Sequence, residues 1–305
     1  MNPSILIVGS SNTDMVIKAD HLPSPGETIL GGNFFMTAGG KGANQAVAAA
    51  RSGGDVTFIT KTGNDIFGRE AIQLFEKENI ETSFIFSDAD HPSGVALITV
   101  DKEGENCIVV ASGANATLSP QDLSAAGEVI EKASIILMQL EIPLETVAYV
   151  ANLASEHHIP VVLNPAPAFA LPDSLLHHVT IITPNETEAE MLTGIHVNSI
   201  DSAEKAAIVL AAKGIATVII TLGAKGALVL HDNLYTHVPA VTVNAVDTTA
   251  AGDVFNGALV VALSEGMHIL EAVSFACRAA AISVTRLGAH ASAPYKNEIE
   301  AFVQS

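Results

Sequence analysis

The chain has 305 residues, with 33 Asp and Glu against 14 Lys and Arg, and a formal net charge of −19. This much negative charge, with no local basic patch, argues against nucleic acid or an anionic membrane as a partner. No apolar run approaches the roughly 18 residues of a membrane span, and no signal-like segment opens the chain, so we expect a soluble cytoplasmic protein. Cys107 and Cys277 lie far apart, which disfavours a disulfide framework or a zinc site.

Short β-branched runs alternate with longer Ala-rich stretches of helical period, which predicts repeated strand and helix units. Strands are predicted at residues 5–8, 56–60, 135–139, 161–164, 181–183 and 218–222. Helices are predicted at residues 43–52, 68–78, 120–132, 143–156, 203–213, 252–264 and 269–284. A final hairpin is predicted from Ala227–His231 and Leu234–Val238. The apolar strand runs are typical of parallel strands covered on both faces. We therefore expect an α/β fold with a doubly wound, mainly parallel sheet flanked by helices.

Two segments break this rhythm, residues 14–35 and 93–111. Both alternate like strands and carry turn signals such as Pro25-Gly26 and Glu103-Gly104, with no helix between strands. We expect them to fold back together as a small antiparallel β lid. The main domain would then comprise residues 1–13, 36–92 and 112–305. The lid would cover the carboxyl ends of the parallel strands, where open α/β sheets bind ligands.

A glycine-rich run, Gly39-Gly40-Lys41-Gly42-Ala43-Asn44, leads into the first predicted helix. Glycines allow a ligand to approach the backbone, and the helix start offers free N–H groups. The spacing matches neither a Walker A loop nor a dinucleotide fingerprint. A tight turn before a helix is the alternative, but the polar residues Lys41 and Asn44 favour ligand binding.

A second run of small residues, 244–253, opens the helix predicted at 252–264. Its backbone amides would face an anion, with the carboxylate of Asp253 at the mouth of the anion site. This pairing suits phosphoryl transfer to an alcohol, in which Asp253 takes the proton of the attacking hydroxyl. The alternative is that Asp253 only caps the helix.

Two weaker signals follow strands. Asn185 and Glu188 offer the oxygen ligands that Mg²⁺ and its waters prefer, and the turn at residues 221–226 could hold nucleotide phosphates through its N–H groups. Each also has an ordinary interpretation: the first as a capped helix start and the second as a hairpin turn.

There is no His-Glu-x-x-His or Gly-x-Ser-x-Gly motif, which argues against a metalloprotease and an α/β-hydrolase. The pairs His157-His158 and His177-His178 are interpreted as solvated helix ends.

Taken in order, these segments resemble the PfkB carbohydrate kinases, and within that family the members that phosphorylate ribose. The run from Gly39 to Arg51 is similar to the first family signature, and residues 247–253 are similar to the second. The segments 164–168, 183–188 and 221–226 are also similar, so the resemblance covers nearly the whole chain.

The resemblance implies transfer of the ATP γ-phosphoryl group to the 5-hydroxyl of D-ribose, giving D-ribose 5-phosphate and ADP. It implies Asp253 as base, with the anion hole formed by Ala250, Ala251 and Gly252. The implied sugar ligands are Asn12, Thr13, Asp14, Gly40, Lys41, Gly42, Asn44, Glu141 and Asp253. A carboxylate such as Asp14 can accept hydrogen bonds from two vicinal hydroxyls, and such a site penalises an analogue that lacks one.

The resemblance also implies a nucleotide site and two kinds of cation. The implied nucleotide residues are Asn185, Thr221, Leu222, Gly223, Ala224, Lys225, Gly226, Gly252 and Cys277. Mg²⁺, which accompanies ATP, would be organised indirectly by Asn185 and Glu188. An activating K⁺ would lie at Asp247, Thr249, Ser283, Arg286, Gly288 and Ser292, several acting through backbone carbonyls.

The chain departs from the family pattern at three positions. His290 stands where Gln is usual, which bears on loop geometry or nucleotide packing. Cys277 stands where relatives often carry His or Asn near adenine, and Ala250 replaces a glycine of the anion hole.

Two rival functions stay open. One is a kinase for 2-deoxyribose or another furanose, and the other is a sugar-binding regulator without catalysis. The apolar lid, with Phe34, Phe35 and other large side chains, predicts a homodimer through the lid.

Overall fold

A computed structural model describes residues 3–302 of the chain. Its central sheet has nine strands in the order β13-β12-β11-β10-β9-β8-β1-β4-β5. All neighbours from β11 to β5 are parallel, and only the β11–β12 and β12–β13 pairs are antiparallel. The strands are β1 (Ser4–Val8), β4 (Asp55–Gly63), β5 (Ile85–Asp88), β8 (Ile135–Met138), β9 (Val161–Leu163), β10 (Ile181–Ile182), β11 (Thr217–Thr221), β12 (Ala227–His231) and β13 (Leu234–Val238). The predicted fold class is confirmed.

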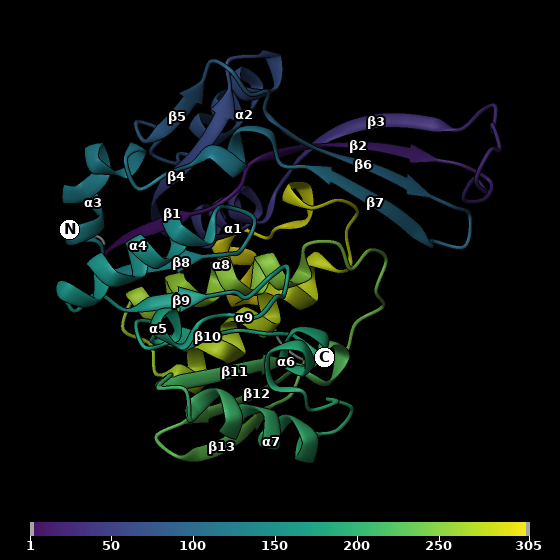
Figure 1. Cartoon of the computed structure of the whole chain (residues 1–305). Helices are drawn as coiled ribbons and strands as arrows, with labels where there is room; N and C mark the ends of the chain where they lie inside the picture. Colours follow the sequence, from purple (N-terminus) through teal and green to yellow (C-terminus); the bar gives the residue numbers. More distant parts are fainter. Residues whose placement is uncertain (1–2, 303–305) are drawn as a thin grey trace.

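Helices cover both faces of this sheet (Figure 1). On β1, Ile5 and Ile7 point into one core and Leu6 and Val8 into the other, as the two-residue period of a strand requires. The first core is closed by α1 (Lys41–Arg51), α8 (Ala251–Ser264) and α9 (Ile269–Ser283). The second is closed by α3 (Gly127–Lys132), α4 (Leu144–Glu156), α6 (Glu186–Thr193) and α7 (Ile200–Ala211).

Several helix boundaries differ from the prediction. The segment 120–132 is not one helix: a 3₁₀ turn, η2 (Asp122–Ala126), precedes the short α3. Asp122 turns its carboxylate back to the N–H and hydroxyl of Ser119 and also pairs with Lys61, so Ser119 does not cap a continuous α-helix. Helix α7 begins three residues before its predicted start, because Ser199 and Ser202 form a capping box there.

Helix α2, predicted at residues 68–78, runs from Ile66 to Lys77. The short elements α5 (Asp173–Leu176), α10 (Lys296–Ala301) and β5 were absent from the prediction, because they lack a long apolar period. Between the described ends of the chain, no helix is long and apolar enough to cross a membrane.

A second sheet of four strands projects from the main body as the lid (Figure 1). Its order is β3-β2-β6-β7, from β2 (Asn12–Lys18), β3 (Asn33–Gly39), β6 (Gly94–Val100) and β7 (Asn106–Ala111). The two inserted segments therefore do fold back together. Each hairpin is antiparallel, whereas the central β2–β6 pair is parallel, because the two hairpins enter the sheet from the same end.

Candidate active site

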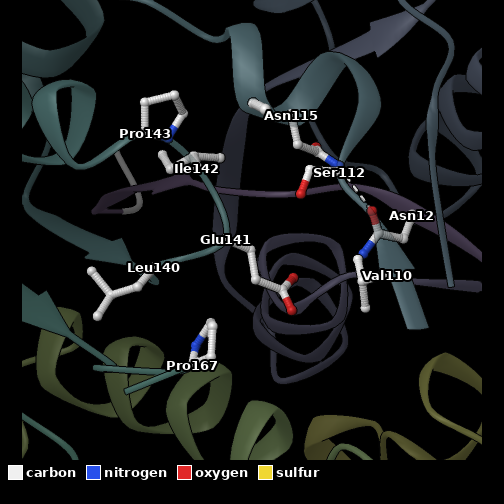
Figure 2. Close-up of a pocket in the computed structure, with 10 residues that line it drawn as sticks. Asn12, Val110, Ser112, Asn115, Leu140, Glu141, Ile142, Pro143 and Pro167 are labelled. Carbon is white, nitrogen blue, oxygen red and sulfur yellow. Dashed lines mark hydrogen bonds between the residues drawn. The ribbon is translucent and has the colours of Figure 1, made fainter. Parts of the chain in front are cut away.

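A cavity of about 560 Å³ lies where the base of the lid meets the carboxyl ends of β1 and β8. Figure 2 shows Asn12 and Glu141 among the residues that line it, together with Leu140, Pro143 and Pro167. Asn12 opens β2, and Glu141 follows β8 by three residues. The structure thus places two of the predicted sugar ligands in one cavity.

The glycine-rich turn packs tightly against the segment between β1 and β2. Gly40 has φ +90°, and a Cβ there would lie 2.8 Å from the backbone nitrogen of Asn12. A Cβ on Gly42 would lie 2.6 Å from the nitrogen of Ser10. Only glycine allows this approach, so the turn brings the start of α1 directly against the segment that leads into Asn12.

Two carboxylates hold this corner of the site. Glu141 accepts hydrogen bonds from the Ser10 hydroxyl at 2.5 Å and from the Lys41 backbone N–H at 3.0 Å. Asp14 packs against Gly39, where any Cβ would collide with its carboxyl group. Burial, together with the charge of Glu141, raises the pKa of Asp14 to about 6. Two acceptors therefore lie beside each other in an enclosed site.

The ladder of β2 sets which side chains share a face. Asn12 and Asp14 are two residues apart and lie on one face, so the intervening Thr13 side chain points to the opposite face. Thr13 could therefore contribute to the predicted sugar site only through its backbone.

Asp253 is 7% exposed and lies in the first turn of α8. One carboxylate oxygen accepts from the Asn44 amide at 2.8 Å, and the other accepts from the Gln45 amide at 2.9 Å. Gln45 also donates to Asn164 at 3.0 Å. The carboxylate is thus oriented by neutral amides, and no hydrogen bond of Asp253 to the backbone of its own helix is formed, as a capping role would require.

Burial raises the pKa of Asp253, while the charge of Lys41 opposes that rise. For Lys41, burial alone would lower the pKa, but the charges of Asp253, Glu141 and Glu188 raise it above its ordinary value. An ammonium group therefore lies among three carboxylates. A raised carboxylate pKa suits a group that must accept a proton near neutral pH.

The start of α8 has the backbone expected of an anion site. Ala250 adopts the left-handed region at φ 59°, and a Cβ on Gly252 would meet nothing within 4 Å. Gly252 is exposed, and its N–H finds no hydrogen-bond acceptor among residues 3–302. The first N–H groups of a helix have no intrahelical partner. The predicted anion-hole amide of Ala251 donates to the Thr248 carbonyl at 3.3 Å, so the Gly252 N–H is the better placed of the two to bind an anion.

The predicted nucleotide segments lie side by side. Thr221 at the end of β11 donates its N–H to the carbonyl of Pro184 at 2.9 Å, and this pairs it with Asn185. Gly223, Ala224 and Lys225 form an exposed 3₁₀ turn, whereas Leu222 is buried in the core and offers only its backbone. Gly226 has φ +100°, and a Cβ there would collide with the carbonyl of Val238.

Asn185 and Glu188 form a capping box, with two reciprocal hydrogen bonds of 2.8 Å. The ordinary interpretation of this motif therefore holds for α6. Burial still raises the pKa of Glu188, and the charges of Lys41 and Asp253 act on it. The side chain that caps this helix is therefore also close enough to Lys41 and Asp253 for their charges to act on its pKa.

The predicted K⁺ residues come from two adjoining loops. The Asp247 carboxylate accepts from the N–H of Thr249 and of Gly288, both at 2.9 Å, and so ties the loops together. Arg286 pairs through its guanidinium with Glu298 at 2.5 Å. Ser283 and Ser292 donate their hydroxyls to carbonyls of their own turns at 2.9 and 2.8 Å, which leaves their oxygen lone pairs available.

Two of the family departures are buried. Cys277 packs in the core with α8, and burial raises the pKa of its thiol to about 12. His290 is 6% exposed, and neither ring nitrogen has a hydrogen-bond partner among the described residues. Arg51 instead binds the His290 carbonyl at 2.8 Å and pairs with Glu78.

Sequence reasoning missed several polar residues that hold the site. Gln45 and Asn164 lie inside the segments that carry the family resemblance, so the motif itself contained that signal. Ser10 and Asn115 had no such signal, because their roles depend on contacts more than 100 residues apart in the chain.

The raised pKa of Asp14 leads to a prediction about pH. Below about pH 6 this carboxylate takes up a proton and loses acceptor strength, so kcat/KM for the sugar should fall as the pH decreases through that range. Glu141→Gln removes a charge that raises the Asp14 pKa, so the acidic limb should move to lower pH although the plateau falls. A pH profile of kcat/KM at saturating ATP measures both. An unshifted limb in the variant would show that Asp14 does not control it.

His290 leads to a prediction about stability. Burial lowers its pKa to about 4, against about 6.5 in the unfolded chain, so the unfolded state binds the proton first and stability falls as the pH drops from 6.5 to 4. In His290→Gln the loss of unfolding free energy between pH 7 and pH 5 should be smaller by about 2 kcal/mol. Urea titrations at both pH values measure this. Equal losses in the two proteins would contradict it.

The histidine pairs outside the site contribute to one cavity. His158, His177 and His178 line a second cavity of about 390 Å³. His177 donates its Nδ1–H to the carbonyl of Asp173. Within residues 3–302 no group of three His, Cys, Asp or Glu side chains has the geometry to hold a metal ion.

Comparison with known proteins agrees with this geometry. The family model described as pfkB family carbohydrate kinase matches residues 2–296. The ribokinase of Haemophilus influenzae is 47% identical, covering 100% of this chain and 99% of that protein. The deoxyribokinase of Salmonella typhi is 40% identical over 95% of each chain. The structure of Arabidopsis thaliana ribokinase complexed with ribose and ATP superposes with a TM-score of 0.93 at 30% identity, covering 98% of each chain. The chain therefore belongs to the pfkB family of carbohydrate kinases.

Proposed function

We propose that this chain transfers the γ-phosphoryl group of ATP to the 5-hydroxyl of D-ribose, giving D-ribose 5-phosphate and ADP. The observation that carries the proposal is the buried carboxylate of Asp253, which is held by Asn44 and Gln45 at the open start of α8. A base of raised pKa beside an anion site is the arrangement that phosphoryl transfer to an alcohol needs. Relatives named ribokinase support ribose as the acceptor. We further propose that the protein acts in the cytoplasm, where ATP is available.

In the proposed reaction Asp253 accepts the proton of the 5-hydroxyl as that oxygen forms its bond to the γ-phosphorus. The bond from the γ-phosphorus to the β,γ-bridging oxygen breaks, and ADP leaves with the electron pair. The N–H groups at Ala250, Ala251 and Gly252 stabilise the charge on the transferring group. Lys41, whose ammonium lies among the carboxylates, adds a positive charge on the sugar side.

The sugar would be held by the face of β2 that carries Asn12 and Asp14, by the glycine turn, and by Glu141. Because Asp14 and Glu141 are neighbouring hydrogen-bond acceptors, a sugar with fewer hydroxyls leaves one of them without a partner. This favours ribose over 2-deoxyribose. The likeness to a deoxyribokinase keeps 2-deoxyribose as the second candidate.

The residues at two loops fit the cations that the family implies. When bound, Mg²⁺ neutralises the phosphates of ATP, and the acidic side chain of Glu188, with Asn185, stands where it can order the waters of that ion. The Asp247 and Gly288 loops, which a hydrogen bond joins, would offer a carboxylate and backbone carbonyls, and these oxygen ligands suit a K⁺ ion. ATP with K⁺ and Mg²⁺ should therefore turn over faster than with Na⁺ in place of K⁺. Equal rates in the two salts would contradict the K⁺ site.

A regulator that binds sugar without catalysis would need neither a base nor an anion hole. The amide network around Asp253 joins three separate segments of the chain through Asn44, Gln45 and Asn164. Sugar binding alone does not require a single carboxylate to be held in this way. We therefore favour the enzyme.

The lid supports a proposed homodimer. One set of large apolar side chains on it is exposed: Ile17, Phe34, Phe35, Met36, Leu97, Ile108, Val109 and Val110. A four-stranded sheet with so much exposed apolar area needs a covering surface.

Sedimentation of the wild-type protein should show a dimer at micromolar concentration. The double variant Phe34→Glu with Leu97→Glu should sediment as a monomer. A monomeric wild-type protein would overturn the proposal.

The position of the transferred phosphate tests the proposed reaction. The ¹³C and ³¹P NMR spectra of the product from ribose and ATP should show coupling of phosphorus to C5. Coupling to C1 would place another hydroxyl against Asp253 and would reject the proposed orientation of the sugar.

A further inference from the structure

Asn115 is 1% exposed and has no assigned role in the reaction. It lies in the 3₁₀ turn η1 (Gly113–Thr117), directly after lid strand β7, and lines the sugar cavity. The turn is anchored at both ends, because the Ala114 N–H donates to the Pro92 carbonyl at 2.8 Å and the Thr117 hydroxyl donates to Asp88 at 2.6 Å. The side chain is therefore presented on a fixed backbone.

The orientation of the Asn115 amide is determined by the backbone of Ser11. The Ser11 N–H donates to Asn115 Oδ1 at 2.9 Å, and the Ser11 carbonyl accepts from Asn115 Nδ2 at 3.0 Å. Backbone donors and acceptors cannot exchange places, so a flipped Asn115 would lose both bonds. Its second Nδ2 hydrogen then points to the neighbouring side chain, Asn12, and binds Asn12 Oδ1 at 2.8 Å.

This bond in turn fixes Asn12. With Oδ1 occupied by a donor, the amide nitrogen of Asn12 must face the other way, and Figure 2 shows it turned from Asn115 into the cavity. Among the described residues, no acceptor pairs with Asn12 Nδ2. Asn12 Nδ2 is therefore a donor in a site whose carboxylates, Asp14 and Glu141, are acceptors.

The absence of a side chain at Gly94 makes this contact possible. Gly94 lies opposite Asn12 in the β2–β6 ladder, and a Cβ there would collide with both Asn12 Oδ1 and Asn115 Nδ2. The lid thus leaves space at its base for one side-chain pair, and that pair joins the start of β2 to the end of β7.

We propose that Asn115 is a positioning residue that fixes the donor face of the Asn12 amide toward an oxygen of the sugar. The inference rests on the proposed function, since it takes Asn12 as a sugar ligand. Without Asn115 the Asn12 amide can rotate, and its oxygen can replace its nitrogen in front of the sugar. An acceptor would then face an acceptor, and sugar affinity would fall without a change at Asp253 or at the ATP segments.

The test is a double-mutant cycle of Asn115→Ala and Asn12→Ala, with ribose as the varied substrate. Asn115→Ala should raise the KM for ribose by about tenfold or more, as expected when a buried hydrogen-bonding group loses its partner, while kcat changes by less than about threefold and the KM for ATP is unchanged. In the Asn12→Ala background the same change should have no further effect on the KM for ribose. Equal, additive effects in both backgrounds would overturn the proposal.

Two further variants separate positioning from stability. Thr146→Val is the matched control, because it removes a buried hydrogen bond of 2.6 Å to the Leu118 carbonyl nearby and has no link to Asn12. It should lower the Tm and leave the KM for ribose unchanged. Asn115→Asp keeps the size of the side chain and the acceptor for Ser11 but cannot donate as a carboxylate, so it should raise the KM as the alanine does. An unchanged KM in a folded Asn115→Asp protein would also reject the proposal.

Wild-type turnover of ribose is measured first. Its absence rejects the proposed function, whereas normal wild-type turnover together with an unchanged KM for ribose in the Asn115 variants rejects only this inference.

Discussion

Replacing Asp253 by Asn should lower kcat for sugar phosphorylation by about two to four orders of magnitude, the usual range for the loss of a general base. The sugar should still bind, because the amides of Asn44 and Gln45 lose a carboxylate partner but the cavity wall at Asn12 and Glu141 is untouched. Steady-state kinetics together with calorimetric ribose binding measures both quantities.

Asp65→Asn is the matched control for this result. Asp65 also stands at a helix start, and its carboxylate accepts from the N–H of Gly68 at 2.9 Å and of Ser93 at 2.8 Å. It is a true cap, so its loss should cost about 1 kcal/mol of stability and leave kcat unchanged. If Asp253→Asn behaved like Asp65→Asn, with lower stability and near-normal kcat, Asp253 would be a cap and not the base.

Replacing Asp14 by Ala should lower kcat/KM for ribose by about 10² to 10⁴, mainly through KM. The reason is that Asp14 is a buried acceptor able to bind two hydroxyls, and its partners on the sugar would be left unpaired. The KM for ATP should not change, since the predicted nucleotide segments lie at β10 and β11, away from the lid.

Asp101→Ala provides the comparison within the lid. Asp101 shapes the turn between β6 and β7 by accepting from the N–H of Glu103 and Glu105 at 3.0 and 2.9 Å. Its loss should affect lid stability and leave the KM for ribose within about threefold. A similar rise in KM for both variants would mean that Asp14 acts only by keeping the lid folded.

The central sheet could be predicted from sequence because its strands are apolar runs of the right length between Ala-rich helices. The segment 120–132 was wrong as one helix because a local signal, Ser119 followed by Pro120, was taken without the long-range pair between Lys61 and Asp122. That ion pair draws Asp122 away from a helical first turn. The parallel pairing of β2 and β6 is equally a long-range property, since alternation in each segment does not reveal how two hairpins join.

The candidate site was predictable where a motif carries its residues in one run, as at Gly40, Lys41 and Asn44. Helix α6 shows the opposite limit: Asn185 and Glu188 satisfy a capping box and the proposed metal site with the same two residues, so sequence cannot separate the two roles. The roles of Asn115 and Ser10 could not be predicted from the sequence. A lone polar residue in a loop acquires its role only when the fold brings it to a partner, which is Ser11 for Asn115 and Glu141 for Ser10.

The central claim is that the enclosed carboxylates and Asp253 together make a ribose kinase. The most direct test is ATP-dependent turnover of ribose, 2-deoxyribose, fructose and adenosine with Mg²⁺ and K⁺, compared as kcat/KM. We expect ribose to exceed 2-deoxyribose by about tenfold or more, because the missing hydroxyl leaves a buried acceptor unpaired. A higher kcat/KM for 2-deoxyribose would contradict the role given to Asp14 and Glu141, and no turnover of any acceptor would contradict the assignment of Asp253 as a base.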